Sequence, residues 1–103
     1  MSWIRYQVMA QEYRISPHAL EECLEEDILV EELEYVLLNG DVLEQYGKRN
    51  DPRGDRCLVL GYRPQGDALH VVVAQACDGA MNVVTTYLPK PPKWLDDKTR
   101  GEL

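Results

Sequence analysis

The hydrophobic period of this chain changes at Gly40, and that change limits what the chain can fold into. Before Gly40 the apolar residues recur every three or four positions, which is the period of a helix with one buried face. The clearest such stripe consists of Val30, Leu33, Val36 and Leu37. After Gly40 the apolar runs are short, rich in valine and bounded by turn residues, as in strands. Helices followed by strands predict the α+β class.

Three helices are predicted before Gly40, over residues 2–12, from residue 17, and over residues 28–39. Ser16 and Pro17 start the second helix, because a serine oxygen caps the first turn and a proline there needs no hydrogen-bond partner. Gly40 ends the third helix, and we expect it to adopt the left-handed conformation. The buried face of the second helix is expected to comprise Leu20, Cys23 and Leu24. Residues 12–16 are expected to form an extended link.

The second half of the chain predicts four strands in an antiparallel meander, over residues 41–46, 56–63, 68–76 and 81–88. Polar segments rich in Gly, Pro and Asp separate them, as turns require. The helices are therefore expected to pack on one face of a four-stranded antiparallel sheet. A chain of 103 residues suits one such domain, which we assign to residues 1–95. The end of the chain has few apolar anchors, and we expect residues 96–103 to form a mobile tail.

The chain is acidic, and its charge is unevenly distributed. The net charge is −7, yet residues 1–46 hold eleven acidic and two basic residues, whereas residues 47–103 hold seven acidic and nine basic ones. This distribution disfavours non-specific binding of nucleic acid. The acids of residues 21–34 follow helical faces rather than the spacing of a calcium-binding loop, and a solvated face is their simplest interpretation.

Cysteine use and the length of the apolar runs indicate the expected compartment. Cys23, Cys57 and Cys77 are widely spaced and include no Cys-x-x-Cys pair, so we expect buried free thiols and no zinc site. No apolar run approaches the ~20 residues of a membrane-spanning helix. The first residues also lack the pattern of a secretory signal. These features predict a cytoplasmic protein that uses no metal or other cofactor.

Several strings of the chain resemble those of a known family in their order and spacing. They are ISPHALEE, EELEYVLLNGDVLEQY, CLVLGY, ALHVVVA and TTYLPKPPKW, and they run from Ile15 to Trp94. Together they resemble the bacterial and archaeal family catalogued as domain of unknown function 4258. No single string is decisive, and the shared order of all five makes the resemblance specific.

The resemblance implies a fold, an activity and a partner. Members of the family look like the toxin of toxin–antitoxin pairs, whose partner is commonly a small zinc-finger, DNA-binding antitoxin. The implied fold is RelE-like and related to barnase-like nucleases, and the implied reaction is metal-independent cleavage of RNA. His18 and His70 match the family's histidines, and Thr86 and Tyr87 match polar residues of its last strand.

The chain departs from the family pattern in the helix that begins at Pro17. Members usually carry an arginine in a His-Ala-x-x-Arg pattern, and a second arginine shortly before the next helix. This chain has Glu22 and Glu26 at those positions. Two cations that would attract phosphate are therefore replaced by two anions on the helix that carries His18.

Metal-free cleavage of RNA needs a base, an acid, and cations that meet the charge growing on the phosphate. His18 is the candidate acid or base, although a histidine in a first helical turn also caps or packs. His70 lies in an apolar strand, where a buried and hydrogen-bonded histidine is the alternative. Tyr87 is expected on the face of the sheet that carries Val83. Arg56, which flanks a loop rich in cations, is the candidate phosphate contact, although acids interleaved in that loop also make it self-neutralising.

Two functions of different classes follow from these residues. The first is a toxin-like endoribonuclease with a protein antitoxin as partner, in which His18 is the acid or base, His70 or Tyr87 assists, and Arg56 contacts phosphate. The second is a catalytically inactive module whose acidic helical face binds a basic protein partner. Complementary charge would make such binding fast and sensitive to salt. An edge strand would also allow a homodimer.

Overall fold

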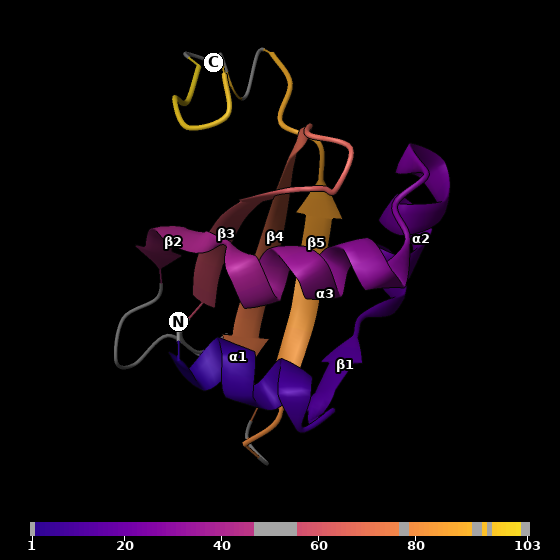
Figure 1. Ribbon diagram of the computed structural model, residues 1–103, viewed down its shortest axis with the longest axis vertical. Coiled ribbons are helices and arrows are strands. Elements are labelled where there is room, and N and C mark those ends of the chain that lie inside the picture. Colours follow the sequence, from indigo (N-terminus) through magenta and orange to yellow (C-terminus); the bar gives the residue numbers. More distant parts are fainter. Residues whose placement is uncertain (1, 47–55, 77–78, 92–93, 95, 102–103) are drawn as a thin grey trace.

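The computed structural model describes residues 2–46, 56–76, 79–91, 94 and 96–101 (Figure 1). In chain order the helices and strands are α1 (Ser2–Met9), β1 (Tyr13–Ile15), α2 (Pro17–Glu26), α3 (Val30–Asn39), β2 (Asp41–Tyr46), β3 (Arg56–Tyr62), β4 (Ala68–Gln75) and β5 (Met81–Tyr87). The strands form one open sheet in the order β1-β5-β4-β3-β2. The predicted α+β class is confirmed for this part of the chain.

The described sheet has five strands, so the prediction of four strands was wrong. The additional strand is β1, which the sequence pattern presents only as an extended link. Tyr13 pairs with Met81 and Ile15 with Val83, and this pairing is parallel, whereas β2 to β5 form the predicted antiparallel meander. Three residues are too few to show a period of two, and the partner strand lies far along the chain. No local signal therefore marks β1 as a strand.

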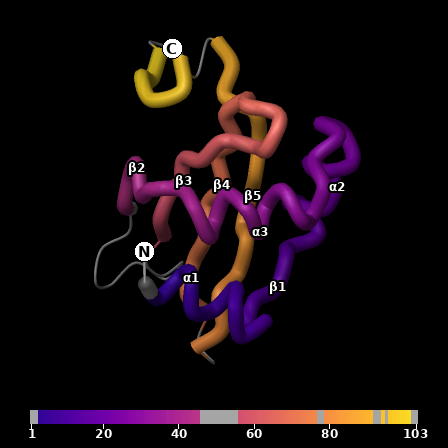
Figure 2. Tube along the Cα trace, viewed as in Figure 1, coloured from indigo at the N-terminus to yellow at the C-terminus, as the bar shows by residue number. Residues whose placement is uncertain are grey.

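Helices α1 and α3 cover one face of the sheet, and the path of the chain in Figure 2 shows α3 crossing the strands. The main hydrophobic core lies between these helices and the sheet. Of the stripe predicted for the third helix, Leu33, Val36 and Leu37 are buried, whereas Val30 at the start of α3 is exposed. Leu69 of β4 is fully buried in the same core. Burying one leucine in this way stabilises the fold by roughly 1.5–3 kcal/mol.

The opposite face of the sheet carries a smaller core, covered by the C-terminal segment. Leu58 and Val72 lie in this core with Trp94, and all three are buried. Trp94 forms a backbone bridge with Arg100, whose guanidinium lies 4.6 Å from the centre of the Trp94 ring. The same guanidinium binds both carboxylate oxygens of Glu44, at 2.9 and 2.6 Å. Residues of the predicted tail therefore contact the sheet, and the mobility expected of that tail stays a prediction.

The helix ends agree with the sequence at one predicted cap and differ at another. Ser16 Oγ accepts a hydrogen bond from the Ala19 amide at 3.0 Å and donates one to the Val84 carbonyl at 2.9 Å, so the predicted N-cap is confirmed. Gly40 was expected to be left-handed, and that prediction was wrong, because its φ is −88° and its ψ is −173°. Glycine is required there for a different reason. A Cβ atom at this position would collide with the carbonyl oxygen of Leu60.

Helix α2 turns a different side toward the core than the sequence predicts. Ala19 and Cys23 are buried, whereas Leu20 and Leu24 are 44% and 82% exposed, so the predicted burial of both leucines was wrong. The helix lies beside the outer edge of β5, and the face of the sheet is covered by α1 and α3 (Figure 1). The contact of α2 with the fold is therefore narrow and takes small side chains, and the two leucines lie outside it.

Three further expectations from the sequence concerned the cysteine thiols, membrane-spanning helices and metal sites. Cys23 is a buried free thiol and Cys57 is half-buried, while Cys77 lies outside the described residues. In the described part of the chain, no helix is both long and apolar enough to cross a membrane. Across the same residues, no group of three or more His, Cys, Asp or Glu side chains is placed to hold a metal ion.

Candidate functional site

Two different elements cover the outer edge of β5. Strand β1 pairs with the first half of β5 as far as Val83, whose carbonyl accepts a hydrogen bond from the Ser16 amide at 3.0 Å. Beyond that point α2 takes the place of a strand through one side chain. Glu22 Oε1 accepts a hydrogen bond from the Thr86 amide at 3.2 Å and another from the Thr85 hydroxyl. The carboxylate therefore satisfies a backbone donor at the edge of the sheet, where β1 has already ended.

His18 lies one helical turn before Glu22, on the same side of α2. Its Nε2 atom is 3.2 Å from Glu22 Oε1, and its side chain is 67% exposed. The imidazole therefore faces solvent, while Thr85 and Thr86 hold its carboxylate partner in place. A carboxylate fixed in this way orients the ring, as an acid–base histidine requires.

His70 is fully buried, on the opposite face of the sheet from α1 and α3. Its Nε2 atom lies 2.7 Å from the carbonyl oxygen of Asp97, so Nε2 carries the proton and donates it. Nδ1 then accepts a hydrogen bond from the Tyr87 hydroxyl at 3.4 Å. Trp94 packs edge-on against the imidazole, with ring centres 4.4 Å apart. Burial lowers the pKa of His70, and the neutral ring acts as a member of the smaller core.

An irregularity in β5 places Tyr87 on the same face of the sheet as His70. The register between β4 and β5 shifts midway, so β5 accommodates one extra residue, which is a β-bulge. Tyr87 consequently pairs with His70 and lies in the smaller core, whereas Val83 lies in the main core, so the predicted face of Tyr87 was wrong. Trp94 Nε1 donates a hydrogen bond to the Tyr87 hydroxyl at 3.2 Å, and burial raises the pKa of that hydroxyl.

The four candidate catalytic residues are not brought into one site. His70 and Tyr87 are in contact in the smaller core, while His18 lies on α2 at the edge of the sheet. Arg56 begins β3 and pairs four residues along β4 from His70, which corresponds to about 13 Å at the rise of a strand. Of the other cations expected to meet phosphate, Lys48, Arg49 and Arg53 lie outside the described part of the chain. Arg63 is described, and its guanidinium pairs with Glu32 and Asp67.

Three further residues make contacts that were not predicted from the sequence. Thr86, which the resemblance singles out, is fully buried and donates a hydrogen bond to the His70 carbonyl at 2.9 Å. Glu22 orients His18, and its position four residues after that histidine was the one available signal. Trp94 covers His70 from a distant part of the chain, and no spacing rule marks that contact.

The outer side of α2 is both apolar and acidic. Leu20 and Leu24 lie four residues apart, so they are neighbours on the helix surface, and both are exposed. Glu21 and Glu25 each follow one of these leucines and are exposed as well. We call these four residues the α2 outer surface. The helix contains no lysine or arginine, so this surface combines apolar area with negative charge that no cation of α2 balances.

Glu22 and Glu26, on the other side of α2, are engaged within the fold. Glu22 binds the edge of β5, as described above. Glu26 Oε2 accepts a hydrogen bond from Lys90 Nζ at 3.2 Å. A phosphate group approaching this side of the helix would therefore meet two carboxylates, and the nearby Lys90 is already paired with one of them.

The fold and these surfaces define a small α+β domain with a helix docked at its sheet edge. Residues 15–88 match the family model described as Domain of unknown function (DUF4258), and the chain belongs to that family. The match includes α2, α3 and β2 to β5 in full, so the family assignment inferred from the five strings is confirmed. No curated protein and no solved structure matches the chain.

Proposed function

We propose that this chain is the protein-binding member of a two-protein pair, and that the α2 outer surface binds a basic segment of its partner. The exposure of Leu24, together with that of its neighbour Leu20, carries this proposal. Leaving a leucine in water forgoes roughly 1.5–3 kcal/mol relative to burying it. Clustered apolar side chains on the surface of a small domain are typical of interaction sites. A partner that covers both leucines would recover this free energy.

Charge identifies the chemistry of the partner. Glu21 and Glu25 flank the two leucines, and α2 supplies no cation to balance them. Opposite charges around an apolar contact accelerate association and reject partners of the same sign. A basic, amphipathic segment therefore fits the α2 outer surface. The resemblance of the family to toxins that bind protein antitoxins supports a protein as the partner.

The partner should contact the outer acids of α2 in preference to the inner ones. Glu22 is held by Thr85 and Thr86 at the edge of β5, and Glu26 by Lys90. Drawing either carboxylate away would break contacts that stabilise the docking of α2. The acidic face predicted as a binding surface comprised Glu21, Glu22, Glu25, Glu26, Glu32 and their neighbours. Since Glu32 is also buried and paired with Arg63, we restrict the proposed surface to Glu21 and Glu25.

The proposal is tested by identifying the partner through affinity capture from the source organism and then measuring the purified pair by calorimetry. Leu24→Ser should weaken binding by about tenfold or more, as expected for a central apolar contact. Glu25→Lys should slow association and reduce its dependence on salt. Met9→Ser is the matched control, because Met9 is 76% exposed on a different helix. Equal affinities for Leu24→Ser and Met9→Ser would refute the proposal.

A second candidate function is metal-independent cleavage of RNA, with His18 as the acid or base. The observation that favours it is the exposed imidazole held 3.2 Å from Glu22. In this reaction the imidazole would take the proton of the 2′-hydroxyl, and the carboxylate would stabilise the imidazolium that forms. Lys90 is paired with Glu26, so cations that meet the phosphate would have to come from other parts of the chain.

Cleavage is tested with purified protein and an end-labelled RNA in the presence of EDTA. His18→Ala should lower the cleavage rate by about 10²–10⁴-fold, the usual contribution of a positioned acid or base. Its unfolding midpoint should not change, because the ring is exposed. Leu24→Ser is the matched control, since it should lose the partner and retain cleavage. Intact RNA after incubation with the wild type would exclude this second function.

A further inference from the structure

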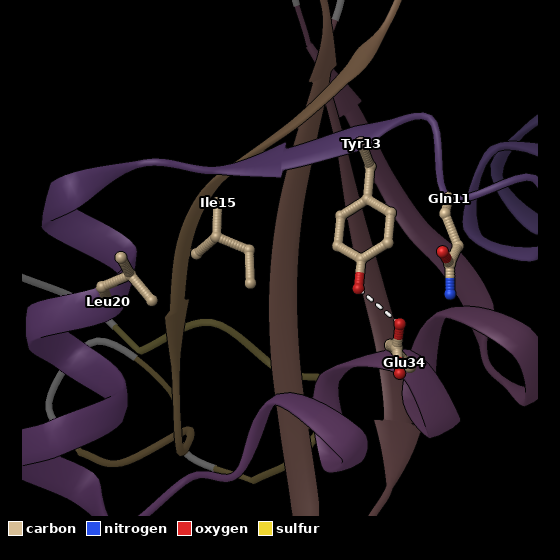
Figure 3. A pocket seen from close by; sticks show the side chains of 5 residues that line it. All are labelled: Gln11, Tyr13, Ile15, Leu20 and Glu34. Carbon is tan, nitrogen blue, oxygen red and sulfur yellow. Dashed lines mark hydrogen bonds between the residues drawn. The ribbon is translucent and has the colours of Figure 1, made fainter.

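A pocket opens at the β1 edge of the sheet, beside α2 and α3. Its volume is about 470 Å³, and it is lined by Gln11, Tyr13, Ile15, Leu20 and Glu34. Figure 3 shows Tyr13 and Ile15 projecting from β1 toward α3, with Leu20 at one end and Gln11 at the other. Glu34 of α3 accepts a hydrogen bond from the Tyr13 hydroxyl. The pocket therefore combines aliphatic and aromatic walls with a single carboxylate.

We propose that this pocket binds the side chain of an arginine or lysine, carried by an extended segment of the partner protein. The inference deepens the proposed function and rests on it, because Leu20 belongs both to the pocket and to the α2 outer surface. A partner bound to the α2 outer surface therefore also contacts the rim of the pocket, because Leu20 is common to both.

The walls of the pocket match the two parts of a long basic side chain. Ile15, Leu20 and the ring of Tyr13 are suited to the methylene stem, which basic side chains bury along apolar surface. Glu34 meets the charged head through a charge-assisted hydrogen bond. One of its oxygens accepts the Tyr13 hydroxyl, and an ionised carboxylate has about four acceptor positions in all, so the second oxygen can accept from a ligand.

The hydroxyl of Tyr13 keeps the pocket selective for cations. Burial, followed by the hydrogen bond from the hydroxyl to Glu34 and the charge of that carboxylate, raises the pKa of Tyr13. The hydroxyl therefore stays protonated and donates to Glu34. Among the described residues, no lysine or arginine lines the pocket, so the carboxylate is the charged group of its described lining. An acidic or neutral side chain would gain no comparable interaction there.

The backbone of β1 favours an extended occupant. The Glu12 carbonyl and the Ser16 amide both bond to β5, at 3.2 and 3.0 Å. Alternate residues of a parallel strand bond to the same neighbour, so the backbone groups of Tyr13 and Ile15 point away from β5. Among the described residues, β1 has β5 as its one neighbouring strand. A partner segment can therefore pair with this edge and direct every second side chain toward the pocket.

The test uses two blocked tripeptides, Val-Arg-Val and the same peptide with citrulline in place of arginine. Citrulline retains the length and hydrogen-bonding atoms of arginine and lacks its charge, so the comparison isolates the interaction with Glu34. Titrations followed by NMR should show amide shifts in β1 and around Glu34. The arginine peptide should bind about fivefold more tightly, given the greater strength of charge-assisted hydrogen bonds. Equal affinities for the two peptides would overturn the inference.

Glu34→Gln is the decisive variant, because glutamine lacks the charge and still accepts a hydrogen bond from Tyr13. It should abolish the preference for arginine over citrulline without changing the unfolding midpoint. Glu31→Gln is the matched control, since Glu31 is an exposed acid of the same helix that does not line the pocket. A preference that survives Glu34→Gln, or one that disappears in Glu31→Gln, would overturn the assignment.

Failure of this inference can be told apart from failure of the proposed function. Leu24 does not line the pocket, so Leu24→Ser should weaken binding of the partner and leave the tripeptide preference intact. If Leu24→Ser has no effect on the partner, docking on α2 is wrong even when the peptides are discriminated. If the partner is lost in Leu24→Ser and the peptides bind equally, the pocket assignment alone is wrong.

Discussion

Replacing Trp94 by alanine tests whether the C-terminal segment is part of the folded core. Trp94 is 1% exposed in the smaller core, packs edge-on against His70 and donates a hydrogen bond to Tyr87. Arg100 lies over its ring. The substitution therefore removes one large aromatic contact, one hydrogen-bond donor, and the surface on which the guanidinium rests.

The expected loss follows from the burial of the indole and from the position of Trp94 in the chain. Truncating a buried aromatic residue to alanine costs about 3–5 kcal/mol of unfolding free energy. The cost has an upper limit here, because Trp94 and residues 96–100 lie at the end of the described fold, and we expect them to leave the sheet together once Trp94 no longer anchors them. Once they detach, only the free energy of docking that segment is lost. We therefore expect a decrease of about 3 kcal/mol, at the lower end of the range for such substitutions.

Urea unfolding followed by circular dichroism measures this loss. The midpoint should fall while the slope of the transition decreases only slightly, since the slope scales with the surface exposed on unfolding and most of the fold is retained. Trp3→Ala is the matched control within the chain, because Trp3 is 38% exposed on α1. It should change the free energy of unfolding by less than about 1 kcal/mol. Equal losses for the two tryptophans would refute the view that Trp94 completes a second core.

Three further predictions concern His70, Ser16 and Gly40. Burial lowers the pKa of folded His70, so the unfolded chain binds protons more strongly, and the free energy of unfolding should fall as pH drops below about 6.5. Urea titrations at several pH values should show this fall in the wild type and not in His70→Gln. Ser16→Ala should lower the free energy of urea unfolding by about 1–2 kcal/mol, because it removes an N-cap and a bond to the Val84 carbonyl. Gly40→Ala should lower it by about 1–3 kcal/mol, because the added Cβ atom meets the backbone of Leu60.

Each of these three predictions has an outcome that contradicts it. For His70, a free energy of unfolding that stays constant between about pH 7 and pH 5 would show that its ring is not buried in neutral form. For Ser16, an alanine variant as stable as the wild type would show that the start of α2 is held by other contacts. For Gly40, an unchanged unfolding midpoint would show that the backbone of α3 and β3 can separate without cost.

Features that depend on adjacent residues were predictable from the sequence. Ser16 and Pro17 define the start of α2 because a cap and a first-turn proline act on the residues that follow immediately. The change of period at Gly40 gave the α+β class, because each period reflects the local geometry of a helix or a strand. The buried stripe of α3 followed from the same spacing, since this helix lies over the face of the sheet.

Features that depend on distant residues were not predictable. Strand β1 exists because Tyr13 and Ile15 meet β5, and nothing in residues 12–16 signals that encounter. Leu20 and Leu24 form an apolar stripe, and a stripe alone does not say whether the core or a partner covers it. The predicted face of Tyr87 was wrong because the bulge in β5 shifts, by one residue, the alternation of its side chains between the two faces of the sheet.

In the candidate site, too, features that depend on adjacent residues were predictable from the sequence and features that depend on distant residues were not. His18 was expected at the head of a helix, and the structure places it there in contact with solvent. The role of Glu22 at the sheet edge depends on Thr85 and Thr86, more than sixty residues away, so its sequence position indicated a lost cation and closeness to His18 but not the contact with β5. The pocket between Tyr13 and Glu34 also depends on elements that meet only in the folded chain.

The parallel pairing of β1 with β5 also has consequences for how the chain folds. Arg14 and Asn82, which are 68 residues apart, join the two strands by a side-chain hydrogen bond of 3.3 Å. Contacts between such distant positions require a long loop to close, and domains rich in them fold more slowly. During synthesis, β1 has no place in the sheet until β5 has been made. The first strand of the described fold to be synthesised therefore cannot pair until the last one has been synthesised. A chain interrupted before β5 would leave β1 without its partner strand.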